Sequence, residues 1–170
     1  MQKRSAWLFG IAGFLGMTPA SLADPGILAP QAAIQANYDH IYSAACRHDL
    51  SLSTRYFVAD FRGEDAVNTV GNRTPPIDLA QLRQVATDYS SASQKITGRA
   101  VIQRLVLSGN QATATVLHHV ILVGASDSKT GRHRRCVFDA TTQDRWLLQP
   151  QGWVMQSGRG ISLRSQYYNK

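Results

Sequence analysis

Residues 99–123 read RAVIQRLVLSGNQATATVLHHVILV, and this stretch decides the fold. Polar and apolar residues alternate on both sides of Ser108-Gly109-Asn110, which is turn material. The alternation predicts two antiparallel strands, 101–107 and 111–123. A third strand is expected over 132–148, and a turn at 149–152 leads into a fourth over 153–160.

Three helices are predicted before these strands. Apolar residues recur at helical spacing over 31–48, and Asp49 can cap a short second helix over 50–57. Residues 62–76 contain Gly and Pro and predict a long loop with at most a short strand. Asp78 can cap a third helix, which ends at a run of serines. Helices followed by sequential antiparallel strands predict one α+β domain, with the helices on one face of a curved sheet.

The N-terminus has the pattern of a signal peptide. Lys3 and Arg4 precede the apolar residues 6–17, and Ser21-Leu22-Ala23 predicts cleavage before Asp24. Twelve residues of helix rise about 18 Å, too short for a hydrocarbon core of about 30 Å. The alternative is a retained membrane anchor. We expect residues 1–23 to be removed, 24–30 to be a flexible lead, and the domain over 24–170 to be periplasmic or secreted, without stable membrane insertion.

The 170-residue chain is 44% hydrophobic and 17% charged, which excludes disorder and a disulfide-dense mini-scaffold. Its formal charge is +7, and removal of the leader would leave +5, with 16 basic and 11 acidic residues. The densest basic cluster, 132–135, lies on a predicted strand, where charges alternate between faces and no aromatic residues are interleaved. We therefore expect no nucleic-acid partner.

The two cysteines, Cys46 and Cys136, both follow the leader. An even number of cysteines in an oxidising compartment predicts one disulfide between them, and two buried free thiols are the alternative. Neither cysteine has a second ligand at zinc spacing, so no metal is expected. The chain also lacks nucleophile-elbow, zinc-protease, phosphate-loop and dinucleotide motifs, and no cofactor is expected.

Turn positions assign the faces of the strands if no bulge changes the register. Turns centred at Gly109, between Asp127 and Ser128, and between Pro150 and Gln151 place the large apolar side chains on one face: Leu105, Leu117, Ile121, Cys136, Phe138, Trp146, Trp153 and Met155. The first helix should pack on this face, which would place Cys46 near Cys136.

Short patterns along the chain resemble the nuclear transport factor 2-like, or SnoaL-like, superfamily. They occur in the order that the superfamily shows: Tyr38-Asp39-x-Ile41, His48-Asp49-Leu50, Tyr56-Phe57-x-x-Asp60-Phe61, Leu79 to Leu82, Leu105-x-Leu107-x-Gly109-Asn110-x-Ala112, Asp144-Arg145-Trp146 and Gly152-Trp153-x-Met155. The resemblance implies a curved antiparallel sheet around a cone-shaped pocket, the cystatin-like or SnoaL-like roll. It also implies a homodimer through the sheet.

The candidate pocket residues are polar or aromatic positions among apolar neighbours: Tyr38, Tyr42, Gln103, Thr115, His119, Phe138, Trp146 and Arg159. His119 with a carboxylate such as Asp144 could act as a general base near neutral pH. A one-residue bulge would put His118 in its place.

Three candidate polar residues have alternative roles. Asp144 could pair with Arg159 across the last hairpin, and His119 could be a hydrogen-bonded rim residue. Asp60 could end the second helix or point into the mouth of the cone.

Two functions follow from these expectations. The first is a non-catalytic domain whose cone binds a small apolar or amphipathic ligand, or whose sheet mediates assembly. The second, which the resemblance to enzymes of this superfamily implies, is a cofactor-free lyase, isomerase or hydrolase that uses the pocket His and an acidic partner. The superfamily includes isomerases, dehydratases, epoxide hydrolases and binding proteins, so the fold does not decide between them.

Overall fold

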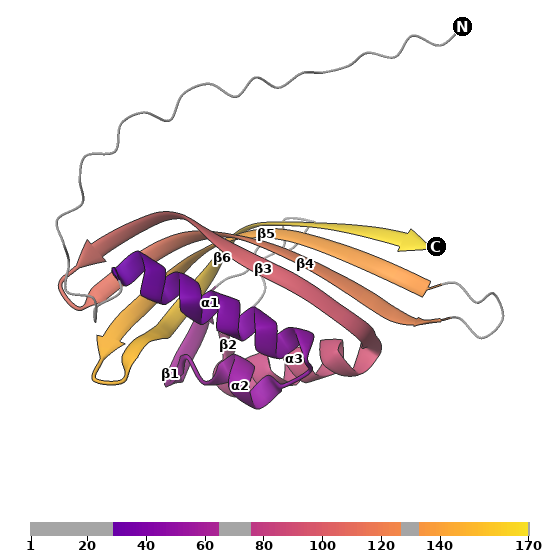
Figure 1. Cartoon of the computed structure of the whole chain (residues 1–170), viewed down its shortest axis with the longest axis horizontal. Helices are drawn as coiled ribbons and strands as arrows, with labels where there is room; N and C mark the ends of the chain where they lie inside the picture. The colour runs from indigo at the N-terminus through magenta and orange to yellow at the C-terminus, as the bar shows by residue number, and fades with distance from the viewer. Residues whose placement is uncertain (1–28, 65–75, 127–132, 170) are drawn as a thin grey trace, which may run out of the picture.

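The computed structural model describes residues 29–64, 76–126 and 133–169, which contain three helices and six strands (Figure 1). The predicted leader, its cleavage site, and residues 65–75 and 127–132 lie outside these ranges. The helices are α1 (Pro30–Cys46), α2 (Leu50–Thr54) and α3 (Leu79–Ala92). None of them is long and apolar enough to cross a membrane.

The helices begin where capping groups are available. Asp49 accepts a hydrogen bond from the backbone N–H of Leu52, and Asp78 forms a reciprocal capping box with Gln81. Pro30 stands in the first turn of α1, where no backbone N–H is needed. The three predicted helices are present, and α2 is shorter than the predicted 50–57.

The strands are β1 (Phe57–Glu64), β2 (Ile77–Asp78), β3 (Ser93–Ser108), β4 (Gln111–Ser126), β5 (His133–Gln149) and β6 (Gly152–Asn169). They form one sheet in the order β2-β1-β6-β5-β4-β3. Strands β3 to β6 are the predicted antiparallel meander, and β1 adds to β6 in parallel. The α+β prediction is confirmed, whereas the prediction of a four-stranded sheet missed β1 and β2.

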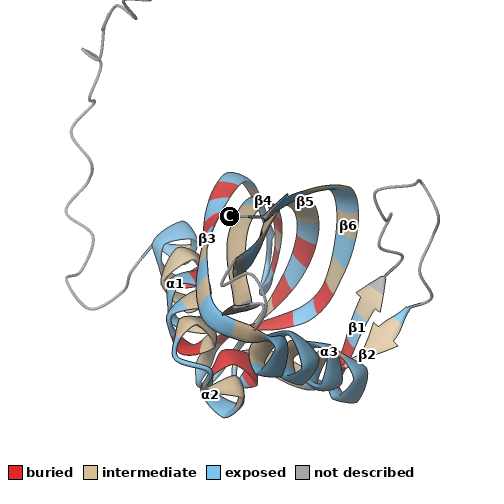
Figure 2. Ribbon diagram, turned by 90° about the vertical axis from the view of Figure 1, so that its right-hand side faces the viewer, coloured by how far each residue is buried: buried red, intermediate tan, exposed pale blue. Residues whose placement is uncertain are grey.

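The sheet is strongly curved, and the helices lie on its concave side (Figures 1 and 2). Helix α1 runs along β3, where the side-chain amide of Gln35 bonds the backbone of this edge strand twice. Its Nε2 donates to the carbonyl of Ala100 at 2.9 Å, and its Oε1 accepts from the N–H of Ile102 at 3.2 Å. The core lies between α1 and the sheet, where Ile34, Tyr38, Val116 and Trp146 are fully buried.

The register of β4 differs from the prediction. In the structure Val120 pairs with Phe138 and Leu122 with Cys136, and a bulge lies between Val123 and Ser126. An odd change of register transfers every side chain of a strand to the opposite face. Leu117 and Ile121 therefore lie on the convex side, and the assignment of these two residues to the concave face was wrong.

The predicted disulfide is not supported, because Cys46 and Cys136 are both free thiols. Cys46 ends α1, which lies along β3, whereas Cys136 belongs to β5, with β4 in between. Two strand spacings amount to about 9.5 Å, and the Cα atoms of a disulfide lie at most about 7 Å apart. The face assignment brought the two cysteines to one side of the sheet but not to adjacent positions.

Candidate functional site

A cavity lies between the helices and the concave face of the sheet. It has two adjoining parts of about 410 Å³ and 400 Å³. The side chains that line both parts are Ile41, Tyr42, Phe57, Leu82 and Leu163. Each part has the volume of a small-molecule site, and the shared side chains place the two parts next to each other.

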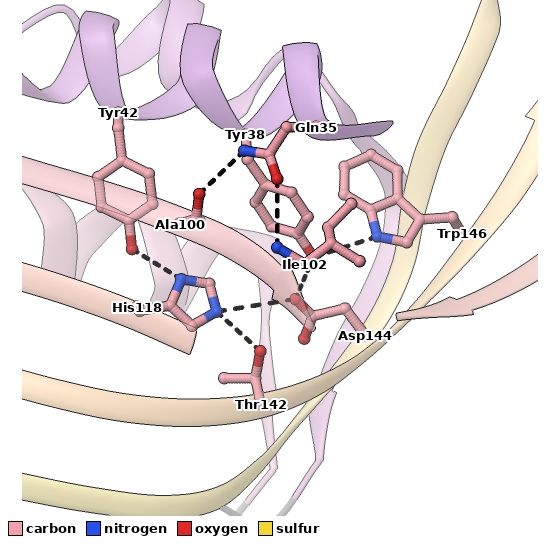
Figure 3. Close-up of polar contacts among 9 residues, drawn as sticks. All are labelled: Gln35, Tyr38, Tyr42, Ala100, Ile102, His118, Thr142, Asp144 and Trp146. Atoms are coloured by element: carbon pink, nitrogen blue, oxygen red, sulfur yellow. Dashed lines mark hydrogen bonds and ion pairs between the residues drawn. The ribbon is translucent and has the colours of Figure 1, made fainter. Parts of the chain in front are cut away.

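The two ends of the cavity differ in chemistry. One end is lined by apolar or aromatic side chains from α3, β4 and β5, among them Ala86, Tyr89, Val120, Leu122 and Phe138. The other end contains a group of polar side chains that we call the polar cluster: Tyr38, Tyr42, His118, Thr142, Asp144 and Trp146. Figure 3 shows the cluster between α1 and the strands β4 and β5.

The carboxyl group of Asp144 is the centre of the polar cluster. The hydroxyl of Tyr38 donates to its Oδ2 atom, and the indole N–H of Trp146 donates to the Tyr38 hydroxyl at 3.2 Å. All three residues are buried, with Asp144 only 4% exposed. Buried donors therefore hold one oxygen of the carboxyl group in place.

A second chain of contacts reaches Asp144 through His118. The Tyr42 hydroxyl lies 2.8 Å from Nδ1 of His118, and Nε2 of the same ring lies 2.8 Å from the Thr142 hydroxyl oxygen. The Nε2 atom is 4.0 Å from Oδ2 of Asp144, too far for a direct hydrogen bond. Thr142 thus connects the imidazole to the carboxyl group.

These contacts have one consistent direction. Thr142 acts on Asp144 as a hydrogen-bond donor, and its single hydroxyl proton is then not available to His118. The Thr142 oxygen must accept from Nε2–H of the imidazole. We therefore assign the Nε2-protonated tautomer to His118, with Nδ1 accepting from Tyr42.

Burial sets the protonation states in the cluster. It raises the pKa of Asp144 to about 6, although the hydrogen bonds from Tyr38 and Thr142 oppose the increase. Burial also lowers the pKa of His118 to about 4, so the imidazole is neutral at pH 7. Burial and the nearby Asp144 carboxylate raise the pKa of both tyrosines above the usual value. Asp144 is therefore the group of this pair that titrates near neutral pH.

Local sequence spacing explains how these side chains come together. Tyr38 and Tyr42 are four residues apart and share one face of α1. Thr142, Asp144 and Trp146 alternate along β5 and point to the concave face, as His118 does from β4.

Two glycines leave the space that the cluster needs. A Cβ atom at Gly98 would lie 2.7 Å from Cε1 of Tyr42, and closer still to Cδ1 of the same ring. A Cβ atom at Gly158 would lie 3.1 Å from Oδ1 of Asp144. The glycines thus let the Tyr42 ring and the carboxyl group lie against the sheet backbone.

Half of the candidate pocket residues lie at the cavity or in its polar cluster. Tyr38, Tyr42 and Phe138 line the cavity, and Trp146 holds Tyr38. The others do not line it: Gln103 and Arg159 are exposed, and Thr115 and His119 lie on the convex side.

The alternative histidine is the one inside the cavity, because the register of β4 places His118 there. His119 instead lies 2.7 Å from Asp139 on the convex face. Asp144 bonds Tyr38 and does not pair with Arg159. Asp60 is exposed on β1, so neither role considered for it holds.

Sequence reasoning missed Thr142, Gly98 and Gly158. Threonine is an ordinary strand residue, and the spacing of Thr142 and Asp144 is informative only once the register is known. No three His, Cys, Asp or Glu side chains gather at one place within the described ranges.

Neither a protein-family model nor a curated protein matches the sequence. Solved structures do match. A protein from Novosphingobium aromaticivorans with the provisional name scytalone dehydratase has a TM-score of 0.65 and 9% identity, over 81% of this chain and 86% of that one. A domain of unknown function with a cystatin-like fold, from Nostoc punctiforme, has a TM-score of 0.52 and 13% identity, over 77% and 75% of the two chains.

The chain has the nuclear transport factor 2-like fold. A third match with this fold is the type 3 hexachlorocyclohexane dehydrochlorinase of Novosphingobium barchaimii, with a TM-score of 0.55 and 12% identity over 82% of this chain and 88% of that one. Identities this low establish the fold alone. Proteins with the nuclear transport factor 2-like fold include enzymes and proteins of unknown function, so the function has to be argued from the cavity.

Proposed function

We propose that the cavity binds a small, mainly apolar molecule that has one polar group and places that group against Asp144. The observation that carries this proposal is a mainly apolar cavity of two adjoining parts, one of which is lined by a buried carboxyl group. An apolar ligand would replace water along the walls, which is favourable, while one hydrogen bond would fix its orientation.

The side of Asp144 that faces Gly158 suggests which polar group fits. Tyr38 occupies Oδ2, and the missing side chain of Gly158 leaves an approach to Oδ1. A carboxylate accepts hydrogen bonds, so a hydroxyl or N–H of the ligand would be held there. Ligands without a donor should bind more weakly than matched ligands that carry one.

The neutral fluorescent probe N-phenylnaphthylamine tests this proposal, because it is apolar and carries one N–H donor. We expect its fluorescence to rise on binding to the full chain. Leu163→Trp should abolish the increase, because Leu163 lines both parts of the cavity and the larger side chain would fill its middle. Leu82→Trp, on the opposite wall, is the second blocking variant.

Leu117→Trp is the matched control, since Leu117 is 39% exposed on the convex face. This variant should bind the probe like the parent chain. Circular dichroism would establish that each variant is folded. Equal binding by folded parent, Leu163→Trp and Leu82→Trp chains would contradict a ligand site in the cavity.

A second candidate function is proton transfer by Asp144, and the pKa of about 6 favours it. A carboxylate with a raised pKa is a stronger base and still largely ionised at pH 7. Two of the structural matches are named as a dehydratase and a dehydrochlorinase, which are names of elimination reactions. In such a step Asp144 would take the proton from a C–H bond, the electron pair would form a double bond, and the leaving group would depart.

In this second candidate function Asp144 is the base and His118 supports it, which reverses the roles that the sequence predicted for the histidine and the carboxylate. His118 is held neutral, with a pKa of about 4, so it is a weaker base than Asp144. Its role would be to orient Thr142 and so to position the carboxyl group.

Deuterium exchange at the acidic C–H bonds of beta-tetralone, followed by NMR, tests the second candidate. The parent chain should accelerate the exchange, and Asp144→Asn should remove the acceleration. Asp139→Asn removes a carboxylate from the convex face and should leave it unchanged. If the Asp144→Asn chain is folded, binds N-phenylnaphthylamine and exchanges as fast as the parent, proton transfer by Asp144 is wrong while the binding function stands.

A further inference from the structure

The helices leave the convex face of the sheet uncovered (Figures 1 and 2). On strands β3 to β6 this face carries most of the protein's net charge. Side chains of a strand point alternately to its two faces, so the neighbours of concave residues such as Gly98, His118 and Asp144 point outward. Five such outward positions on the flanking strands β3 and β6 are basic: Lys95, Arg99, Arg104, Arg159 and Arg164.

Strand β5 adds Arg135 and Arg145, which makes seven cations on this face. On β3 to β6, within the described ranges, Asp139 is the one carboxylate that points outward, and its partner is His119. On these four strands the convex face therefore carries a formal charge of +6, and the whole chain carries +7. Within the described ranges none of the seven cations has an ion-pair partner.

Aliphatic side chains lie between the two rows of cations. Val101 and Leu117 are paired across β3 and β4, and they are 48% and 39% exposed. Ile121 and Val137 are paired across β4 and β5 on the same face. The face thus combines two apolar pairs, separated by the His119–Asp139 pair, with cations along both sides. We call this surface the basic face.

We propose that the basic face binds the surface of an anionic lipid membrane. Arginine side chains would bind lipid phosphates, and the apolar pairs would enter the interfacial layer. Two copies of the chain would bring +6 against +6 if their basic faces met, and this repulsion argues against a homodimer through the sheet. Nucleic acid fits less well, because aliphatic rather than aromatic side chains lie between the cations.

Vesicle sedimentation with the full chain tests this proposal. Vesicles of phosphatidylglycerol and phosphatidylcholine in equal parts should bind the chain at low salt and release it at high salt, and vesicles of phosphatidylcholine alone should bind it weakly. Each cation near an anionic surface changes the affinity about fivefold, so Arg99→Glu with Arg164→Glu should lower it at least about 25-fold.

The matched control is Arg47→Glu with Arg55→Glu, which makes the same change of charge on exposed residues of the helix side. It should retain most of the affinity. Every variant keeps the same first 28 residues, so the leader contributes equally to all of them. Leu117→Ser should weaken binding a few-fold without changing its dependence on salt.

Several outcomes would overturn the proposal. Equal losses of vesicle affinity in the two double variants would show that binding depends on the total charge of the chain and not on the basic face. Tighter binding to a duplex DNA of matched phosphate concentration would favour nucleic acid. A dimer in light scattering that Arg99→Glu with Arg164→Glu converts to a monomer would favour a second copy. None of these outcomes depends on the cavity, so the proposed ligand binding is tested separately.

Discussion

His118 and His119 are neighbours on β4, yet each belongs to a different His–Asp pair on an opposite face of the sheet. The inner histidine is 14% exposed and reaches Asp144 through Thr142, whereas the outer one is 37% exposed and lies 2.7 Å from Asp139. Burial lowers the pKa of His118 and raises that of Asp144. The same residue types thus form a coupled, dry network inside and an ordinary surface pair outside. Burial therefore distinguishes the two pairs, although their residue types are the same.

The largest difference in stability between the two faces is expected for the side chains that enclose the inner pair. Trp146 is fully buried and donates to Tyr38, so Trp146→Ala should lower the free energy of unfolding by about 3–5 kcal/mol. Leu117→Ala, on the convex face, should cost less than about 1 kcal/mol. Urea unfolding of both variants checks this prediction. A loss below about 1 kcal/mol for Trp146→Ala would mean that the inner network is not packed as the structure has it.

The inner pair also predicts an unusual dependence of stability on pH. Asp144 has a raised pKa, so its contribution to stability is fully present below pH 4 and is lost as the pH rises through about 6. His118 has a lowered pKa, so its contribution is present above pH 6.5 and is lost as the pH falls through about 4. Each contribution is on the order of 3 kcal/mol. Between pH 4 and 6 the contribution of Asp144 falls and that of His118 rises, so the two changes with pH largely cancel.

Asp144→Asn would remove the pH-dependent contribution of Asp144 and leave that of His118. The stability of that variant should rise with pH between 4 and 6.5, more steeply than the parent's. His118→Gln should show the opposite, a stability that falls across the same interval. Urea unfolding at several pH values measures both slopes. Parallel pH profiles for the parent and the two variants would contradict the assigned pKa shifts.

The sequence predicted the fold well because the relevant signals are local. The alternation around Gly109, the caps at Asp49 and Asp78, and the helical spacing before Cys46 each lie within a few residues of the element that they predict. Strand β1 was missed because its main partner is remote. Phe57 pairs with Met155, and a bulge interrupts the pairing before Arg62.

The site was harder to predict because it depends on register. One bulge between Val123 and Ser126 accompanies the change that puts His118 rather than His119 inside. Gly124 lies in that stretch, and a glycine at the end of a strand is as typical of a loop as of a bulge. Gln103, Thr115 and Arg159 were misplaced for the same kind of reason, since one residue of offset exchanges the two faces of a strand. The aromatic candidates were placed correctly, because large side chains lie in the core whichever neighbour they pair with.

A glycine offers a smaller test of how tightly the inner network is packed. Gly98→Ala would place a methyl group too close to the Tyr42 ring, so the ring would have to move. We expect a loss of about 1–3 kcal/mol and a weaker contact between Tyr42 and His118. Thr97→Ala, at the neighbouring outward position, should change stability by less than about 0.5 kcal/mol. Thermal unfolding compares the two.

The smallest effect is expected at the outer pair itself. His119 and Asp139 are both in contact with water, and exposed ion pairs contribute about 0–1 kcal/mol. His119→Ala and Asp139→Ala should each change the free energy of unfolding by less than about 0.5 kcal/mol, and a double-mutant cycle should give a coupling of similar size that disappears at high salt. A coupling above about 2 kcal/mol would mean that water is excluded from the convex face. The charge of that face would then be covered in the folded protein, and its proposed contact with lipid would lose its physical basis.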